Sequence, residues 1–305
     1  MVQRKYGALE RKVIDIFLSE GEFNFQGKRY KVVKIDKPQK QGGSGEPKTD
    51  VYIKGEEIGG NDTIELKLSV KKRDFEFIEN KITAVRMKDI LGDDWEEIIQ
   101  NASEKIANSF SNFYLIYPEA KYPTLKNSIT LGWKAEITNK ERTLSAKMDL
   151  TEQEIKDLLY KGINLPPDKR DAIVNGGIIP DSGIAEYIIE TELDDIHTTQ
   201  DVLSQMELID DAHLGDAYLV FTANNYRTDT AKCDGARSLA VRVNWEVQNG
   251  KITPHFMYHD PLAFTGKEAV PSLLKALEEL GKFHPEEMVP EEDVSDPSKV
   301  YKKKQ

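Results

Sequence analysis

The chain has 305 residues, of which 39% are hydrophobic and 31% are charged. This composition is typical of a globular protein, and the length allows one large domain or two. No apolar run approaches the roughly 20 residues of a membrane span, and residues 1–6 lack the apolar segment of a signal peptide. The lone Cys233 excludes an internal disulfide, and the absence of a glycine-rich phosphate fingerprint argues against a nucleotide cofactor. We therefore expect a cytoplasmic protein without a membrane anchor.

The first elements in chain order are a helix and a strand. Residues 6–20 are predicted to be helical, because apolar side chains recur there at helical spacing and Gly21 follows them. Glu10 lies on the helix surface beside that apolar stripe. Residues 30–36, Tyr-Lys-Val-Val-Lys-Ile-Asp, are predicted to form a strand.

Two strand-like runs follow, residues 50–53 and 63–69, on either side of a turn-rich stretch. In the second run apolar side chains alternate with Glu65 and Lys67, as they do in a half-buried strand. If the hairpin closes about its middle, Asp50 lies opposite these two charged residues. Two carboxylates and an ammonium group would then share one place on the surface.

Such a group has a chemical use. Mg²⁺ is bound in proteins by one or two carboxylates together with phosphate oxygens and water. The pattern of Asp50, a gap of fourteen residues and then Glu65-Leu66-Lys67 resembles the PD-(D/E)xK nuclease superfamily. The resemblance covers roughly residues 1–110, and it departs from the family pattern in having Thr49 where a proline often precedes the aspartate.

The resemblance implies an α/β (α+β) fold with a mixed central sheet flanked by helices, the nuclease-like core being joined to a larger additional region. It implies that Asp50 and Glu65 bind Mg²⁺ or Mn²⁺ and that Lys67 positions the attacking water. The helix before the first core strand often supplies another ligand in this superfamily, and Glu10 is the candidate. A surface carboxylate is the alternative for Glu10. The implied activity is endonucleolytic hydrolysis of DNA, as in a type II restriction enzyme.

A second interpretation stays open at this point. Glu-x-Lys recurs at several other places in the chain, for example at Glu154-Ile155-Lys156, so the tripeptide by itself carries little information. The hairpin could be an ordinary amphipathic one whose charges face water. The chain would then be a non-catalytic binding or assembly protein, for instance one encoded by a phage.

The charge distribution bears on the partner. The net charge is −11, but residues 1–90 hold 19 Lys and Arg against 15 Asp and Glu, whereas the remainder holds 23 against 38. Double-stranded DNA is therefore the expected partner of the N-terminal part, and a homodimer is a further expectation. Each candidate contact could equally be a solvated surface residue. The candidate DNA-binding residues are Lys48, Lys71, Lys72, Arg73, Asn225 and Arg227.

The remaining elements suggest a division of the chain. A helix over 94–112 and a strand over 113–117 would complete the nuclease core, which we place in residues 1–120. Residues 121–284 are predicted to serve recognition and assembly, and residues 285–305 to form a disordered tail. The further predicted elements are strands at 128–138, 217–223, 239–247 and 252–258, helices at 151–162, 198–208 and 267–280, and tight turns at Asn175-Gly176 and Asn249-Gly250.

Overall fold

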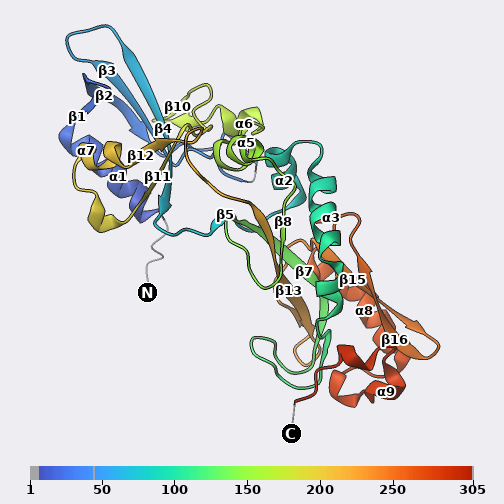
Figure 1. The fold of residues 1–305 in the computed structure, drawn as a ribbon. Coiled ribbons are helices and arrows are strands. Elements are labelled where there is room, and N and C mark those ends of the chain that lie inside the picture. Colours follow the sequence, from blue (N-terminus) through green and yellow to red (C-terminus); the bar gives the residue numbers. More distant parts are fainter. Residues whose placement is uncertain (1–6, 44, 304–305) are drawn as a thin grey trace. The chain divides into compact units, whose positions relative to one another are not determined.

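The computed structural model describes residues 7–43 and 45–303. The protein has a mixed α/β architecture, and the chain forms two compact units, each assembled from separate segments (Figure 1). Unit 1 consists of the residues up to 78 with 89–92 and 150–215, and unit 2 of 79–88, 93–149 and the residues from 216 onward. The units therefore do not follow the predicted boundaries at residues 120 and 284.

Unit 1 is built on a six-stranded mixed sheet. Neighbouring strands are antiparallel except for β4 and β11, which are parallel. The strands in their spatial order are β1 (Glu22–Phe25), β2 (Lys28–Asp36), β3 (Val51–Glu57), β4 (Thr63–Lys72), β11 (Tyr187–Thr191) and β12 (Met206–Leu208).

One face of this sheet carries the core of unit 1. The helix α1 (Ala8–Glu20) buries Leu9, Val13 and Phe17, which recur on one face of a helix because 3.6 residues make a turn. It packs against β1 to β4 and against α7 (Thr199–Ser204), beside the apolar side chains that alternate along β3 and β4. α1 ends at Gly21, whose left-handed φ of 70° allows its N–H to donate to the Phe17 carbonyl. Tyr6, the predicted first residue of this helix, lies outside the described residues.

The segment 150–215 completes unit 1. Thr151 and Glu154 form the predicted capping box, and the following turns are a π-helix that Gly162 ends. This segment also supplies β11, the one parallel strand, next to β4. The other elements of the segment are α5 (Glu152–Glu154), η1 (Ile155–Lys161), α6 (Pro167–Arg170), β9 (Ile173–Val174), β10 (Gly177–Ile178) and η2 (Leu193–Asp195).

Unit 2 is organised around the long strand β7, which pairs with β13 and β15. The ring of Phe110 packs on Trp133 of β7, with ring centroids 4.8 Å apart, and on Phe221 of β13, with ring centroids 5.0 Å apart. The strands are β6 (Ile116–Tyr117), β7 (Ser128–Thr138), β8 (Ser145–Lys147), β13 (Tyr218–Arg227), β14 (Lys232–Cys233), β15 (Val241–Gln248) and β16 (Lys251–Met257); β5 (Phe77–Glu79) contains the boundary between the units. The principal helices are α3 (Trp95–Lys105), α4 (Ala107–Ser111) and α8 (Gly266–Leu280), and α2 (Ala84–Leu91) crosses the boundary.

Two predictions about organisation were wrong. The helical stretch 94–112 and the strand after it belong to unit 2, so they do not complete the sheet that carries Asp50. The expected disordered tail is ordered over 285–303: it forms η3 (Pro285–Glu287), α9 (Pro290–Asp293) and η4 (Pro297–Lys299). Val294 and Val300 are buried there and form bridges with β16 and β6, so apolar contacts hold a segment whose composition is acidic. Residues 304 and 305 lie outside the described residues.

Most local predictions were confirmed. The strand at 128–138 coincides with β7, and the two Asn-Gly turns have positive φ at both residues, as tight hairpin turns require. The predicted helix at 198–208 is divided, because α7 ends at Ser204 and the next residues form β12. Within the described residues no helix is long and apolar enough to cross a membrane.

Candidate active site at the start of β3

The register of the β3–β4 hairpin decides which side chains meet Asp50. Tyr52 pairs with Lys67, and Lys54 pairs with Glu65. The N–H of Asp50 donates to the Leu68 carbonyl at 2.8 Å, so the neighbour of Asp50 on β4 is Ser69. Glu65 lies four residues further along the strand, or about 13 Å away by strand rise. The expectation that Asp50 faces Glu65 and Lys67 was therefore wrong.

Asp50 is held by the end of β4. Its carboxylate oxygen Oδ2 accepts a hydrogen bond from the Val70 N–H at 2.8 Å and a longer one from the Ser69 hydroxyl at 3.4 Å. The Lys71 ammonium nitrogen lies 3.7 Å from the same oxygen. Ser69-Val70-Lys71 thus occupies the place beside Asp50 where the resemblance predicts Glu-x-Lys. Lys71, which the sequence analysis assigned to DNA binding, is the lysine of this site.

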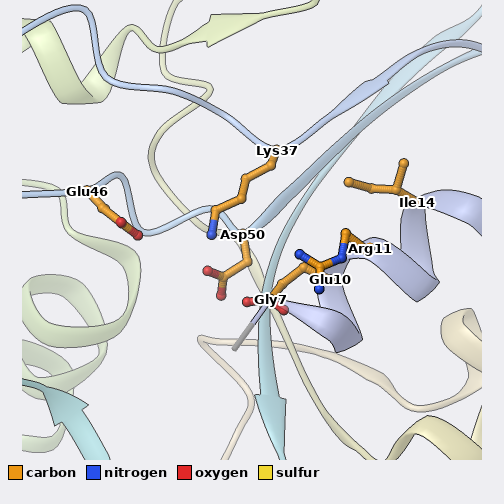
Figure 2. Close-up of a pocket in the computed structure, with 7 residues that line it drawn as sticks. All are labelled: Gly7, Glu10, Arg11, Ile14, Lys37, Glu46 and Asp50. Atoms are coloured by element: carbon orange, nitrogen blue, oxygen red, sulfur yellow. The ribbon is translucent and has the colours of Figure 1, made fainter. Parts of the chain in front are cut away.

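A cavity of about 390 Å³ opens in front of Asp50. Figure 2 shows the carboxylates of Asp50 and Glu10 turned toward this hollow, with the Lys37 ammonium group above Asp50. Glu10 comes from the first turn of α1, Lys37 follows β2, and Glu46 belongs to the loop that leads into β3. The structure thus places Glu10 at one cavity with Asp50. The remaining lining residues are Gly7, Arg11 and Ile14.

Two glycines position these groups. Gly183 accepts hydrogen bonds on its carbonyl from the N–H groups of Lys48 and Thr49, which fixes the chain just before Asp50. A Cβ atom at Gly183 would lie 1.9 Å from the Lys169 carbonyl oxygen, so no larger residue fits this backbone. Gly7 has a left-handed φ of 80° at the start of α1, and a Cβ there would lie 3.4 Å from the Arg11 guanidinium.

Glu65 and Lys67 have other partners. Glu65 forms an ion pair with Lys54 at 3.2 Å. Lys67 is buried, with its ammonium nitrogen 2.7 Å from Glu186 and 3.5 Å from the Asp181 carbonyl. Burial raises the pKa of the Tyr52 phenol well above its usual range, and the nearby Glu65 carboxylate raises it further. This end of the hairpin is closed by its neighbours and does not open on the cavity.

The donor set limits what the cavity can hold. Asp50 and Glu10 supply carboxylate oxygens, which suit a hard cation such as Mg²⁺ that keeps several water or phosphate ligands. Among the described residues, no cluster of three or more His, Cys, Asp or Glu side chains is close enough to hold a metal ion. Within the described residues the two carboxylates therefore do not make up an all-protein metal cage.

The other predicted DNA-binding residues are placed differently. Lys48 is buried, Lys72 is exposed, and Arg73 forms an ion pair with Asp195 at 2.7 Å. Asn225 and Arg227 belong to β13 in unit 2.

Asn225 is buried, and both ends of its amide are bonded. Its carbonyl oxygen accepts from the Thr130 hydroxyl at 2.9 Å, and its NH₂ group donates to Asp234 at 3.0 Å. The guanidinium of Arg227 lies 3.5 Å from the same Asp234 carboxylate. Because Asn225 is buried and both ends of its amide already have internal partners, it is poorly placed to read a base edge.

The charge of unit 1 also differs from the expectation. With the segment 150–215 included, unit 1 has 20 Lys and Arg against 29 Asp and Glu, and unit 2 has 22 against 24. The basic N-terminal segment therefore lies within an acidic unit, and any attraction for DNA must be local to the cavity and its surroundings. The sequence analysis missed Ser69 and the roles of Lys37 and Arg11 as lining residues; the regular spacing of lysines over 28–40 was the signal for Lys37.

Comparison with known protein families, with curated proteins and with solved structures finds no significant match.

Proposed function

We propose that the chain is a divalent-metal-dependent endonuclease that hydrolyses DNA phosphodiester bonds at the cavity in front of Asp50. The observation that carries this proposal is the surroundings of Asp50, which lines a cavity together with Glu10 and has the Lys71 ammonium group 3.7 Å from its carboxylate. A carboxylate pair with an adjacent lysine is the combination that the resemblance requires. In this proposal Asp50 and Glu10 hold Mg²⁺ or Mn²⁺, and Lys71 takes the role first assigned to Lys67.

The chemistry divides between the cation and the protein. A bound divalent cation would polarise the phosphodiester and make a bound water more acidic. The Val70 N–H fixes one oxygen of Asp50, so this carboxylate keeps its orientation toward the cavity. Lys71 can donate hydrogen bonds to the attacking water or to a phosphate oxygen, and its charge offsets the negative charge that develops on the phosphoryl group.

The finer assignment to a type II restriction endonuclease is also part of the proposal. A second unit as large as unit 2 suits sequence recognition better than it suits a minimal nuclease, which is an argument by analogy. A homodimer acting on double-stranded DNA in the cytoplasm agrees with that assignment.

Incubation of the purified protein with plasmid and genomic DNA tests the proposal directly. We expect cleavage with Mg²⁺ or Mn²⁺ and none with EDTA. Discrete fragments would support a restriction enzyme, and a smear would support a nuclease of low sequence specificity. Intact DNA at all metal concentrations, with a protein that is shown to be folded, would refute the nuclease proposal.

One observation favours a non-catalytic binding or assembly protein as the second candidate. Asp50 already accepts from the Val70 N–H and lies beside Lys71, so its carboxylate has partners without any ligand. In that case Asp50 is a structural residue that closes the end of the hairpin. Loss of folding stability in Asp50→Asn, without any nuclease activity of the wild type, is the result that this candidate predicts.

A further inference from the structure

Two cations at the cavity have no assigned role. Arg11 projects from α1 and Lys37 from the segment after β2, and Figure 2 shows both side chains around the hollow that Asp50 and Glu10 line. Neither forms an ion pair with any described residue. Lys54, Lys67, Lys71 and Arg73, by contrast, each have a carboxylate partner.

We infer that Arg11 and Lys37 form a phosphate clamp, which holds a DNA phosphodiester next to the Asp50–Glu10 carboxylates. The inference rests on the proposed function, because it names the group through which the substrate is held at that same site. The ligand of the clamp is the polynucleotide backbone. Without the two cations, the carboxylates that line the cavity would repel this anion.

The charges at the cavity support this assignment. Three carboxylates line it, those of Glu10, Glu46 and Asp50. If Arg11 and Lys37 served only to neutralise them, ion pairs within the cavity would be expected, yet within the described part of the chain neither cation lies within 4.0 Å of a carboxylate oxygen. Cations that stand at a cavity without an internal partner can reach an incoming anion without first breaking an ion pair.

The two side chains also suit a phosphodiester. An arginine guanidinium can donate two parallel hydrogen bonds to the non-bridging oxygens of a phosphate, and a lysine ammonium acts on the same group as a compact point charge. Because the carboxylates repel a phosphate, the positive charges of the clamp would lower that repulsion. The expected result is tighter binding of DNA in a register that brings one phosphodiester to Asp50.

The test uses DNA binding, which does not require cleavage. The full chain and its variants Arg11→Ala and Lys37→Ala are titrated into a labelled 30-base-pair duplex with Ca²⁺ over a range of salt concentrations. Lys12→Ala and Lys40→Ala serve as matched controls, because Lys12 directly follows Arg11, Lys40 comes three positions after Lys37, and neither lines the cavity. We expect each clamp variant to bind about tenfold more weakly, and the slope of log K against log salt to fall by about 0.9 for each phosphate contact that is lost.

Two further measurements sharpen the result. Arg11→Lys should recover only part of the affinity, because lysine lacks the two-pronged donor geometry. Competition with inorganic phosphate and with a mononucleotide distinguishes the source of the anion. We expect neither to displace the duplex at millimolar concentration; displacement by inorganic phosphate that the clamp variants abolish would assign the site to a free phosphate and overturn the inference.

The outcomes separate this inference from the proposed function. If the wild type cleaves DNA while Arg11→Ala and Lys37→Ala keep the wild-type affinity and salt slope, the clamp is refuted and the nuclease stands. If the wild type binds DNA through these residues but never cleaves it, the clamp stands and the nuclease proposal fails. Equal losses in the clamp and control variants would show a diffuse charge effect, and they would refute the clamp.

Discussion

The two ends of the β3–β4 hairpin carry similar side chains in different surroundings. At one end Glu65 pairs with Lys54 and Lys67 is buried against Glu186. At the other end Asp50 has Lys71 beside it, and a cavity opens in front of it. A carboxylate and a lysine two residues apart on a strand are therefore not a site in themselves. The proposed site lies instead at the end of the hairpin where a cavity opens in front of Asp50.

The largest expected effect separates Asp50 from Glu65. We expect Asp50→Asn to lower the rate of Mg²⁺-dependent plasmid cleavage by about a thousandfold, because it removes a carboxylate that the proposal assigns to the divalent cation, and the cation stabilises the charge of the transition state. Glu65→Gln should stay within about threefold of the wild type, because Glu65 does not line the cavity and its half-buried ion pair with Lys54 contributes at most about 1 kcal/mol. If Glu65→Gln is as inactive as Asp50→Asn, the site lies at the other end of the hairpin.

The two lysines should separate in the same way. Lys71→Ala is expected to lower the cleavage rate by about a hundredfold, because its charge stabilises negative charge on the phosphoryl group. Lys67→Ala should keep the activity of the folded protein but lower the free energy of unfolding by about 1–2 kcal/mol, because it removes a charged hydrogen bond from a buried position. Cleavage kinetics and chemical denaturation of both variants provide the measurement. A reversed pattern, with Lys67 needed for cleavage and Lys71 for stability, would contradict the proposed site.

Metal should control DNA binding at the Asp50 end alone. Without a cation Asp50 and Glu10 repel a phosphate, and a divalent ion reverses the local field. We expect Ca²⁺ to increase wild-type affinity for DNA by about tenfold, which is about 1.4 kcal/mol. An Asp50→Asn, Glu10→Gln double variant should bind DNA equally with EDTA and with Ca²⁺, whereas Glu65→Gln should keep the response. A wild-type affinity that is the same in both conditions would show that these carboxylates do not face the nucleic acid.

The smallest expected effect concerns Ser69. Its hydroxyl donates to Asp50 over 3.4 Å, which is long for a hydrogen bond between oxygens, while the Val70 N–H holds the same carboxylate at 2.8 Å. We therefore expect Ser69→Ala to retain cleavage within about threefold of the wild type. A loss of a hundredfold in the same assay would show that the hydroxyl takes part in the chemistry.

Much of the local structure could be predicted, because it depends on neighbours in the chain. The apolar spacing that predicted a helix over 6–20 is the spacing that α1 buries, and the alternation over 128–138 is that of β7. Asn175-Gly176 and Asn249-Gly250 adopt the positive φ angles that make them turns. The sequence also indicated Asp50 and Glu10 as members of one site, and both line the cavity.

The sequence by itself determined which face of each strand is apolar, but it did not determine the register of the hairpin. A slip of one residue would turn the apolar side chains to the wrong face, whereas a slip of two or four keeps every one of them in the core. The alternation is therefore satisfied equally well by Glu65, Lys67, Ser69 or Lys71 opposite Asp50. The length of β3 and β4 up to their turn determines the register, and with it which of these residues lies opposite Asp50.

The tertiary structure also decided which segments share a unit. The parallel strand β11 reaches β4 from more than a hundred residues away, and Gly183 of the same segment fixes the chain just before Asp50. No pattern within residues 1–110 contains these partners. Local spacing determines the elements because it acts between residues that are close along the chain, whereas the site depends on contacts that form only once distant segments pack together.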